Sequence, residues 1–322
     1  MTLQGSSTYV IRDVTDLNHP FTASTLGDLA PLSGPKAAYA PQIVAGTDLA
    51  YYGDDGVLMR KPFDGSPLLV TTPCDGFLGF TWSSDGARAA YATDANGYST
   101  GQVRMVFGGH DSIFGDMPAQ PLAGCLPPCD EYVDLRILFS PDGRYLAFNS
   151  YWRITLRVWS IDGRVLEAID SEEPGHPHSG PTMSVWSGSG YFYRDWRGVE
   201  VWRDGVTSLV LSGVAWIGPK GSPAGGQVVY VAKDQAGIPD VFLLDTASGT
   251  ARLIVKSRSN PVFLTPRYLW YRGERTCAAG EPYPCGAEGT ILTGKTYIYD
   301  LQTGSESESI IKDVWDVWPH PA

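Results

Sequence analysis

Residues 139–150 read FSPDGRYLAFNS, and residues 82–93 repeat the same pattern as WSSDGARAAYAT. Each copy starts with an aromatic residue, passes through Ser, a variable residue and Asp-Gly, and ends in alternating small and aromatic residues. Asp-Gly predicts a tight turn, because Gly accepts positive φ and the Asp side chain caps nearby backbone N–H groups. Each copy is therefore predicted to be a β-hairpin, and a hairpin that recurs along a chain indicates a repeat architecture.

Weaker copies follow the same plan: Trp186-Ser-Gly-Ser-Gly before YFYR, Phe263-Leu-Thr-Pro before RYLWYR, and Trp216, which leads through a Gly/Pro loop to QVVYVA. The Ser-Pro-Asp-Gly turn followed by RYLAF resembles the WD-repeat-like module of TolB-type β-propellers. The resemblance extends over nearly all of residues 40–322 and implies the fold rather than the function. TolB-like relatives bind protein partners, and the resemblance implies the same kind of role here.

The repeat predicts an all-β chain folded as a single β-propeller domain over residues 1–322. Seven residues mark the predicted ends of the innermost strands and indicate seven blades: Val44, Trp82, Phe139, Trp186, Trp216, Phe263 and Trp318. Six blades is the alternative, if the short repeat 186–215 merges with a neighbour. Residues 8–14 and 20–26 are typical of a third and a fourth strand, so we expect them to share a blade with residues 313–320. Such terminal strands would close the ring and remove exposed sheet edges.

Composition excludes several classes of protein. The chain of 322 residues has a net charge of −11 and no Lys/Arg cluster, which argues against nucleic-acid binding because phosphates require a positive surface. No apolar run approaches the roughly 20 residues that a membrane span requires. The sequence has no Gly-x-Ser-x-Gly elbow, no phosphate-binding Gly-rich loop and no EF-hand spacing. The acidic surface is expected to keep the protein soluble, and we expect a monomer without a cofactor.

The positions of the five cysteines bear on the cellular compartment of the protein. Cys125 and Cys129, and likewise Cys277 and Cys285, lie in Gly/Pro-rich loops at separations that a small-loop disulfide could close, and Cys74 is left over. A zinc site built from the two pairs is one competing interpretation, although the pairs fall in different repeats, and unpaired thiols are another. Disulfides would place the protein in the periplasm or outside the cell. No signal peptide precedes Thr2, so an exported chain is expected to have lost its leader.

The predicted binding site lies on the face onto which the turns between second and third strands open, named here the mouth face. Interface hot spots are enriched in aromatic and Arg side chains. The turns on this face carry several of them: Trp152, Arg153, Arg194, Trp196 and Arg197. The loop with His176 and His178 is expected to extend the site. Its two His and the preceding Glu pair could also bind a divalent metal, although a solvated connector has the same composition. Alternatively, the tryptophans pack on adjacent blades and the charges are only solvated.

The sequence therefore favours a non-catalytic binding or scaffold propeller of a secreted, periplasmic or cell-surface bacterial protein. Its ligand would be a partner protein or an oligosaccharide that carries carboxylates or a negative patch. The alternative is a polysaccharide lyase or glycoside hydrolase that acts in the same central funnel. Carboxylate pairs such as Asp54 with Asp55 and Asp234 with Asp240 keep this alternative open. A regulatory module of a longer protein is a third possibility.

Overall fold

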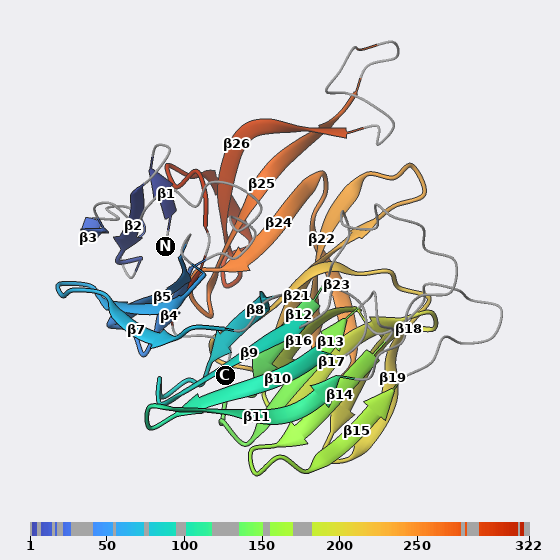
Figure 1. Ribbon diagram of the computed structural model, residues 1–322. Helices are drawn as coiled ribbons and strands as arrows, with labels where there is room; N and C mark the ends of the chain where they lie inside the picture. Colours follow the sequence, from blue (N-terminus) through green and yellow to red (C-terminus); the bar gives the residue numbers. More distant parts are fainter. Residues whose placement is uncertain are drawn as a thin grey trace.

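The fold consists of β-sheets, as the repeat predicts (Figure 1). The computed structural model describes residues 2–4, 8–14, 17, 22–26, 41–53, 56–73, 77–94, 101–117, 135–150, 155–169, 182–277, 281, 290–314 and 316–318. Within these residues, six antiparallel sheets have four strands each and one has three. The strand order follows the chain order in every sheet, which is the meander expected of propeller blades.

The three-stranded sheet comprises β1 (Thr2–Gln4), β2 (Thr8–Arg12) and β3 (Thr22–Leu26). The next two sheets comprise β4 (Gln42–Val44), β5 (Asp48–Tyr52), β6 (Leu58–Pro62) and β7 (Leu68–Thr71), then β8 (Phe77–Trp82), β9 (Arg88–Asp94), β10 (Gly101–Phe107) and β11 (His110–Met117). They are followed by β12 (Leu135–Phe139), β13 (Tyr145–Ser150), β14 (Thr155–Ser160) and β15 (Val165–Ile169), then β16 (Thr182–Ser187), β17 (Gly190–Asp195), β18 (Gly198–Arg203) and β19 (Val206–Ser212). The last two sheets comprise β20 (Ile217–Gly221), β21 (Gln227–Lys233), β22 (Pro239–Asp245) and β23 (Thr250–Val255), then β24 (Arg258–Phe263), β25 (Tyr268–Thr276), β26 (Thr290–Asp300) and β27 (Ser305–Glu308).

The Ser-x-Asp-Gly turn forms as predicted between β12 and β13. Ser140 Oγ donates to Asp142 Oδ1 at 2.7 Å, and Asp142 Oδ1 accepts the backbone N–H of Arg144 at 3.1 Å. Ser140 Oγ also accepts the N–H of Tyr145 at 2.9 Å, while Gly143 adopts φ +68°. Side chains thus satisfy the backbone groups that the turn exposes. The copy between β8 and β9 makes the same bonds, through Ser83, Asp85, Ala87 and Arg88.

Hydrophobic clusters lie between consecutive sheets. One cluster joins Ala147 and Val158 to Trp186 and Tyr191 of the next sheet, and the other sheets from β4 to β27 are joined in the same way. The first strands β8, β12, β16, β20 and β24 lie side by side in that order. Five of the predicted inner-strand aromatics are buried, as expected: Trp82, Phe139, Trp186, Trp216 and Phe263.

One innermost strand differs from the prediction. Trp216 does not end this strand, because β20 begins at the next residue and runs through the predicted Gly/Pro loop. Gly218 adopts φ +54° within an irregularity of the β20–β21 ladder between Ile217 and Lys220. A bulge at glycine lets a strand continue through a sequence that is typical of a loop. The side chain of Trp216 is nevertheless fully buried.

Described segments near the two ends of the chain approach each other. The predicted N-terminal strands pair as β2 and β3, and β1 adds a third strand to them. Val14 and Leu17 share a hydrophobic cluster with Val314 and Val317, beside the β24–β27 sheet. Trp318 packs with Ile11 and with the β4–β5 hairpin. No strand is assigned to residues 311–314 or 316–318, so the shared closing blade and the seven-blade count stay predictions.

Candidate binding surface

The structure describes three of the predicted binding residues, all in one hairpin. Arg194 lies near the end of β17, and Trp196 and Arg197 form the turn to β18. The other four, Trp152, Arg153, His176 and His178, lie outside the described residues. So do Cys125, Cys129 and Cys285. Cys277, which immediately follows β25, is disulfide-bonded. Its partner is not among the described residues, so the pairing with Cys285 stays a prediction.

The turn between β17 and β18 is held by its own side chains. Asp195 Oδ1 accepts the N–H of Arg197 at 2.8 Å and that of Gly198 at 3.2 Å. Gly198 adopts φ +138°, and a Cβ atom there would lie 1.9 Å from the carbonyl oxygen of Leu211. Only glycine fits this position. The N–H of Gly213 donates to the carbonyl of Arg197 at 2.7 Å, which ties the turn to the end of β19.

Arg197 also supports a buried carboxylate. Its Nε donates to Asp195 Oδ2 at 3.1 Å, and its Nη2 forms an ion pair with Glu200, which is 2% exposed. Glu200 Oε2 accepts the hydroxyl of buried Tyr193 at 3.0 Å. Burial, followed by the charge of Asp195, raises the pKa of Glu200. Two carboxylates already pair with Arg197, so this side chain braces the turn as well as contributing to its surface.

Trp196 is the exposed member of the hairpin. Its side chain is 43% exposed, an unusual degree for tryptophan. The guanidinium of Arg197 lies 6.0 Å from the centre of its ring, within the range of a cation–π contact. Arg194 is half-buried and lies opposite Thr182 in the β16–β17 ladder. The hairpin thus presents an aromatic side chain on a turn fixed by hydrogen bonds.

Asp234 and Asp240, a carboxylate pair that kept the enzyme alternative open, are committed to the fold. Asp234 Oδ1 accepts the N–H groups of Ala236 at 2.8 Å and Ile238 at 2.9 Å, and buried Asp240 accepts that of Ser257 at 3.0 Å. Such backbone contacts are typical of turn-capping aspartates.

Arg272, Glu274 and Arg275 lie within β25, because this strand extends to Thr276. An irregularity in the ladder at Gly273 allows this extension, and Arg272 pairs with Asp313.

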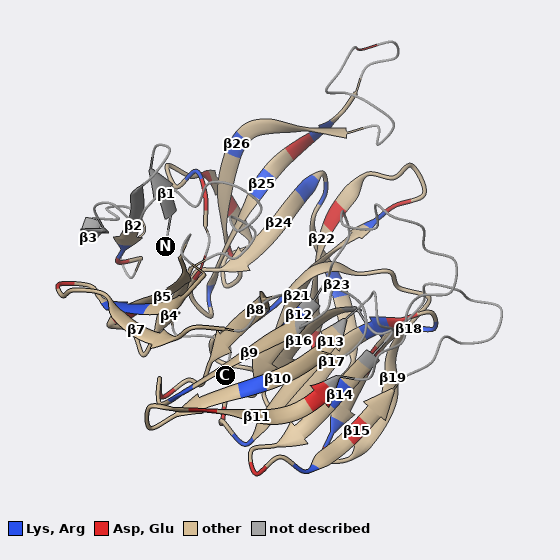
Figure 2. Cartoon of the chain, in the orientation of Figure 1, with Lys and Arg blue, Asp and Glu red and all other residues tan. Residues whose placement is uncertain are grey.

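Among the residues that the structure describes, no three His, Cys, Asp or Glu side chains gather as a metal site would require. None of the described segments forms an apolar helix of membrane-spanning length. Figure 2 shows the described Lys and Arg residues distributed over several sheets and interspersed with Asp and Glu.

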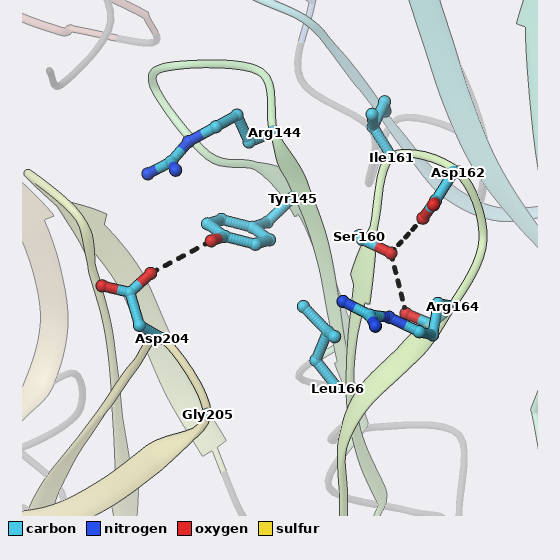
Figure 3. Close-up of a pocket in the computed structure, with 9 residues that line it drawn as sticks. All are labelled: Arg144, Tyr145, Ser160, Ile161, Asp162, Arg164, Leu166, Asp204 and Gly205. Carbon is cyan, nitrogen blue, oxygen red and sulfur yellow. Dashed lines mark hydrogen bonds between the residues drawn. The ribbon is translucent and has the colours of Figure 1, made fainter.

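A groove that was not predicted from the sequence lies between the β12–β15 and β16–β19 sheets (Figure 3). Its volume is about 470 Å³, and we name it the rim groove after the sheets' outer strands. Residues 160–163, SIDG, are a further Ser-x-Asp-Gly copy, and this was the signal available in the sequence. The groove is lined by Arg144, Tyr145, Ser160, Ile161, Asp162, Arg164, Leu166, Asp204 and Gly205.

Comparison with known proteins identifies the fold alone. No protein-family model matches the chain, and no curated protein matches it in sequence. Among solved structures, a candidate 6-phosphogluconolactonase from Bacteroides fragilis matches with 17% identity and a TM-score of 0.55, covering 96% of this chain and 95% of that one. The Cps50 (Swd1) β-propeller domain of Myceliophteria thermophila matches with 12% identity and a TM-score of 0.53, covering 89% of both chains. An oligogalacturonate lyase in complex with manganese matches with 11% identity and a TM-score of 0.53, covering 84% and 76%.

TolB from Acinetobacter baumannii also matches, with 12% identity and a TM-score of 0.45. The match covers 80% of this chain but only 60% of that TolB chain. The predicted β-propeller fold is confirmed by the match to the Cps50 (Swd1) propeller domain. The structure thus has a β-propeller fold, which occurs in both binding proteins and enzymes.

Proposed function

We propose that the chain is a non-catalytic binding propeller that captures a partner protein or an oligosaccharide at its mouth face, with Trp196 as the anchor. The observation that carries the proposal is the exposure of Trp196 on a turn fixed by Asp195, Arg197 and Gly198. An exposed tryptophan on a rigid turn can bury a large area on binding while losing little conformational entropy.

Arg194 is the proposed cationic neighbour for a ligand carboxylate, since Arg197 already pairs with two carboxylates. We further propose that Trp152, Arg153, His176 and His178 complete the site, in a monomeric seven-bladed ring. A disulfide at Cys277 favours an oxidising compartment, so the periplasm or the cell exterior is the proposed location.

The test is affinity capture from periplasmic and cell-surface extracts with three immobilised proteins: wild type, Trp196→Ala and Leu253→Ala. Leu253, on β23, is 42% exposed and therefore serves as a matched control for loss of exposed apolar surface. A partner should be recovered by wild type and Leu253→Ala but be depleted at least about tenfold with Trp196→Ala, as for a hot-spot residue. Equal recovery by all three proteins would remove Trp196 from the site.

The rival function, a polysaccharide lyase or glycoside hydrolase, requires its own assay. Wild-type protein is incubated with oligogalacturonate and with other acidic and neutral polysaccharides, with and without Mn²⁺. Ultraviolet absorbance detects unsaturated lyase products, and a reducing-sugar assay detects hydrolysis. Turnover that scales with protein concentration would replace the binding proposal by the catalytic one.

A further inference from the structure

β19 is an outer strand of uncharged residues, and a bulge at Val210 interrupts its ladder with β18. It is the last strand in the hydrogen-bonded order of its sheet. Its seven residues, VTSLVLS, contain no charge and no proline. Val206 is 67% exposed and Leu209 is 46% exposed. A long, uncharged edge strand can pair its free backbone groups with a further strand.

The outer strands of the other four-stranded sheets differ from β19. β7 has only four residues, and short edges pair poorly. β11, β15, β23 and β27 each carry charge, as in the sequence SESE of β27. Charged side chains on an edge oppose the addition of another strand. The described structure therefore marks β19 as the outer edge best suited to strand addition among these six sheets.

The rim groove begins where β19 begins. Asp204 and Gly205, which line the groove, immediately precede Val206. Leu166 of β15 lies in the same groove, and Figure 3 shows the Arg164 side chain extending into the space beside it. A strand added along β19 would thus have one end at this groove.

One cation that lines the groove, Arg164, has no ion pair with a described residue. Asp204 Oδ1 accepts the Tyr145 hydroxyl at 3.1 Å, and Arg144 pairs with Asp142 at 2.5 Å. Asp162 accepts a hydrogen bond from Ser160. Arg164 acts on Asp162 through its charge but forms no ion pair with any described residue. A carboxylate beside Leu166 could therefore pair with Arg164 in a bidentate manner.

We propose that β19 binds an extended segment of a partner protein as a fifth strand, antiparallel to β19, with the C-terminal carboxylate of that segment held by Arg164 in the rim groove. The antiparallel direction follows from charge, since β19 starts at the groove and an antiparallel partner must end there. A parallel partner would instead bring its N-terminal side to Arg164. Main-chain pairing supplies affinity in this mode of recognition, and the groove supplies specificity. The site does not include Trp196, although the far end of β19 is tied to the Trp196–Arg197 turn through the hydrogen bond from Gly213 to Arg197.

The probe is a heptapeptide of alternating Thr and Val with an N-terminal fluorophore and a free C-terminal carboxylate, and binding is followed by fluorescence anisotropy. A peptide with a C-terminal amide tests the contact with Arg164, and it should bind about three- to fivefold more weakly, as loss of one exposed ion pair predicts. A peptide N-methylated at alternate residues tests strand addition and should show no saturable binding, because it lacks the required N–H donors.

Protein variants separate the rim groove from other surfaces. The variant Arg164→Gln should bind the free-acid peptide and the amide peptide with equal affinity. This affinity should match that of the wild-type protein for the amide peptide. Arg252→Gln removes an exposed Arg from outer strand β23 and should behave as wild type. Trp196→Ala should also leave this binding unchanged, even if it abolishes capture at the mouth face. The proposal is overturned if the free acid does not bind, if N-methylation has no effect, if acid and amide bind wild type equally, or if Trp196→Ala abolishes the binding.

Discussion

The backbone N–H of Ile43 donates a hydrogen bond of 2.6 Å to the carboxylate Oδ2 of Asp316, across 273 residues of sequence. The neighbouring turn is equally close to the C-terminal segment, because a Cβ atom on Gly46 would lie 2.7 Å from Nε1 of Trp318. The first four-stranded sheet is therefore tied to the end of the chain. This is the arrangement expected where the two ends of a propeller meet.

Replacing Asp316 should weaken the whole fold, because the replacement leaves the N–H of Ile43 without its acceptor. Hydrogen bonds to charged groups contribute about 1.5–3 kcal/mol, and we expect Asp316→Ala to lose this amount of unfolding free energy in denaturant titration. Asp316→Asn keeps an acceptor oxygen and should lose less than half as much. A loss below about 0.5 kcal/mol for Asp316→Ala would show that the contact does not stabilise the fold.

Removing Arg197 should destabilise the protein in a pH-dependent way. The variant Arg197→Ala leaves the buried Glu200 carboxylate with less compensation, and we expect a loss of about 1–3 kcal/mol at pH 7. The pKa of Glu200 is raised in the fold, so its contribution to stability is complete below its unfolded pKa and declines as pH rises through the folded value.

Acidifying Arg197→Ala from pH 7 to pH 5 should therefore recover part of the loss, as measured by thermal unfolding. The double variant Arg197→Ala/Glu200→Gln should be more stable than the single variant at pH 7. If the single variant has the same melting temperature as wild type at every pH, Arg197 is not a brace.

Buried tyrosines should make the protein sensitive to alkali. Burial raises the pKa of Tyr230 to about 12, against about 10 in an unfolded chain. A raised pKa stabilises the fold fully below pH 10, and this stability is lost as pH rises towards 12. Between pH 10 and 11 wild type should lose about 1 kcal/mol more than Tyr230→Phe in the free energy of unfolding. Parallel losses in the two proteins would contradict the burial of the hydroxyl.

Two tryptophans ten positions apart should respond in opposite ways. Trp186 is buried and donates from Nε1 to the carbonyl of Leu138 at 3.1 Å, so Trp186→Ala should cost about 3–5 kcal/mol. Trp196 is exposed, and Trp196→Ala should change stability by less than about 0.5 kcal/mol. Chemical denaturation of both variants measures the difference. A large loss in Trp196→Ala would make its side chain part of the core.

Local chemistry could be predicted from the sequence because it depends on residues within one turn. The bonds of Ser140, Asp142 and Gly143 need only five neighbouring positions, and they form as the motif indicates. The hydrogen bonds from Ser83 and then Ala87 also lower the pKa of Asp85, as expected of a capping carboxylate. Buried inner-strand aromatics followed from the same repeat.

Features that depend on glycine within a strand or on contacts between sheets were not predictable in this way. Gly218 and Gly273 are typical of loops, yet each lies in an irregularity of a continuing strand. The second carboxylate partner of Arg197 requires the register of β18, which places Glu200 beneath the turn. The rim groove combines turns from two sheets, so it exists only after Ser160 and Asp204 are brought together.

The hydrophobic clusters between sheets determine how local unfolding of one sheet affects its neighbours. Each cluster joins consecutive sheets, and residues of β8–β11 contribute to the clusters on both sides of that sheet. A chain of nearest-neighbour contacts transmits a local defect step by step, as in other repeat proteins. Unfolding of one sheet would expose an apolar face on each of its two neighbours. Partial unfolding would therefore expose two hydrophobic surfaces at once and favour aggregation over a stable intermediate.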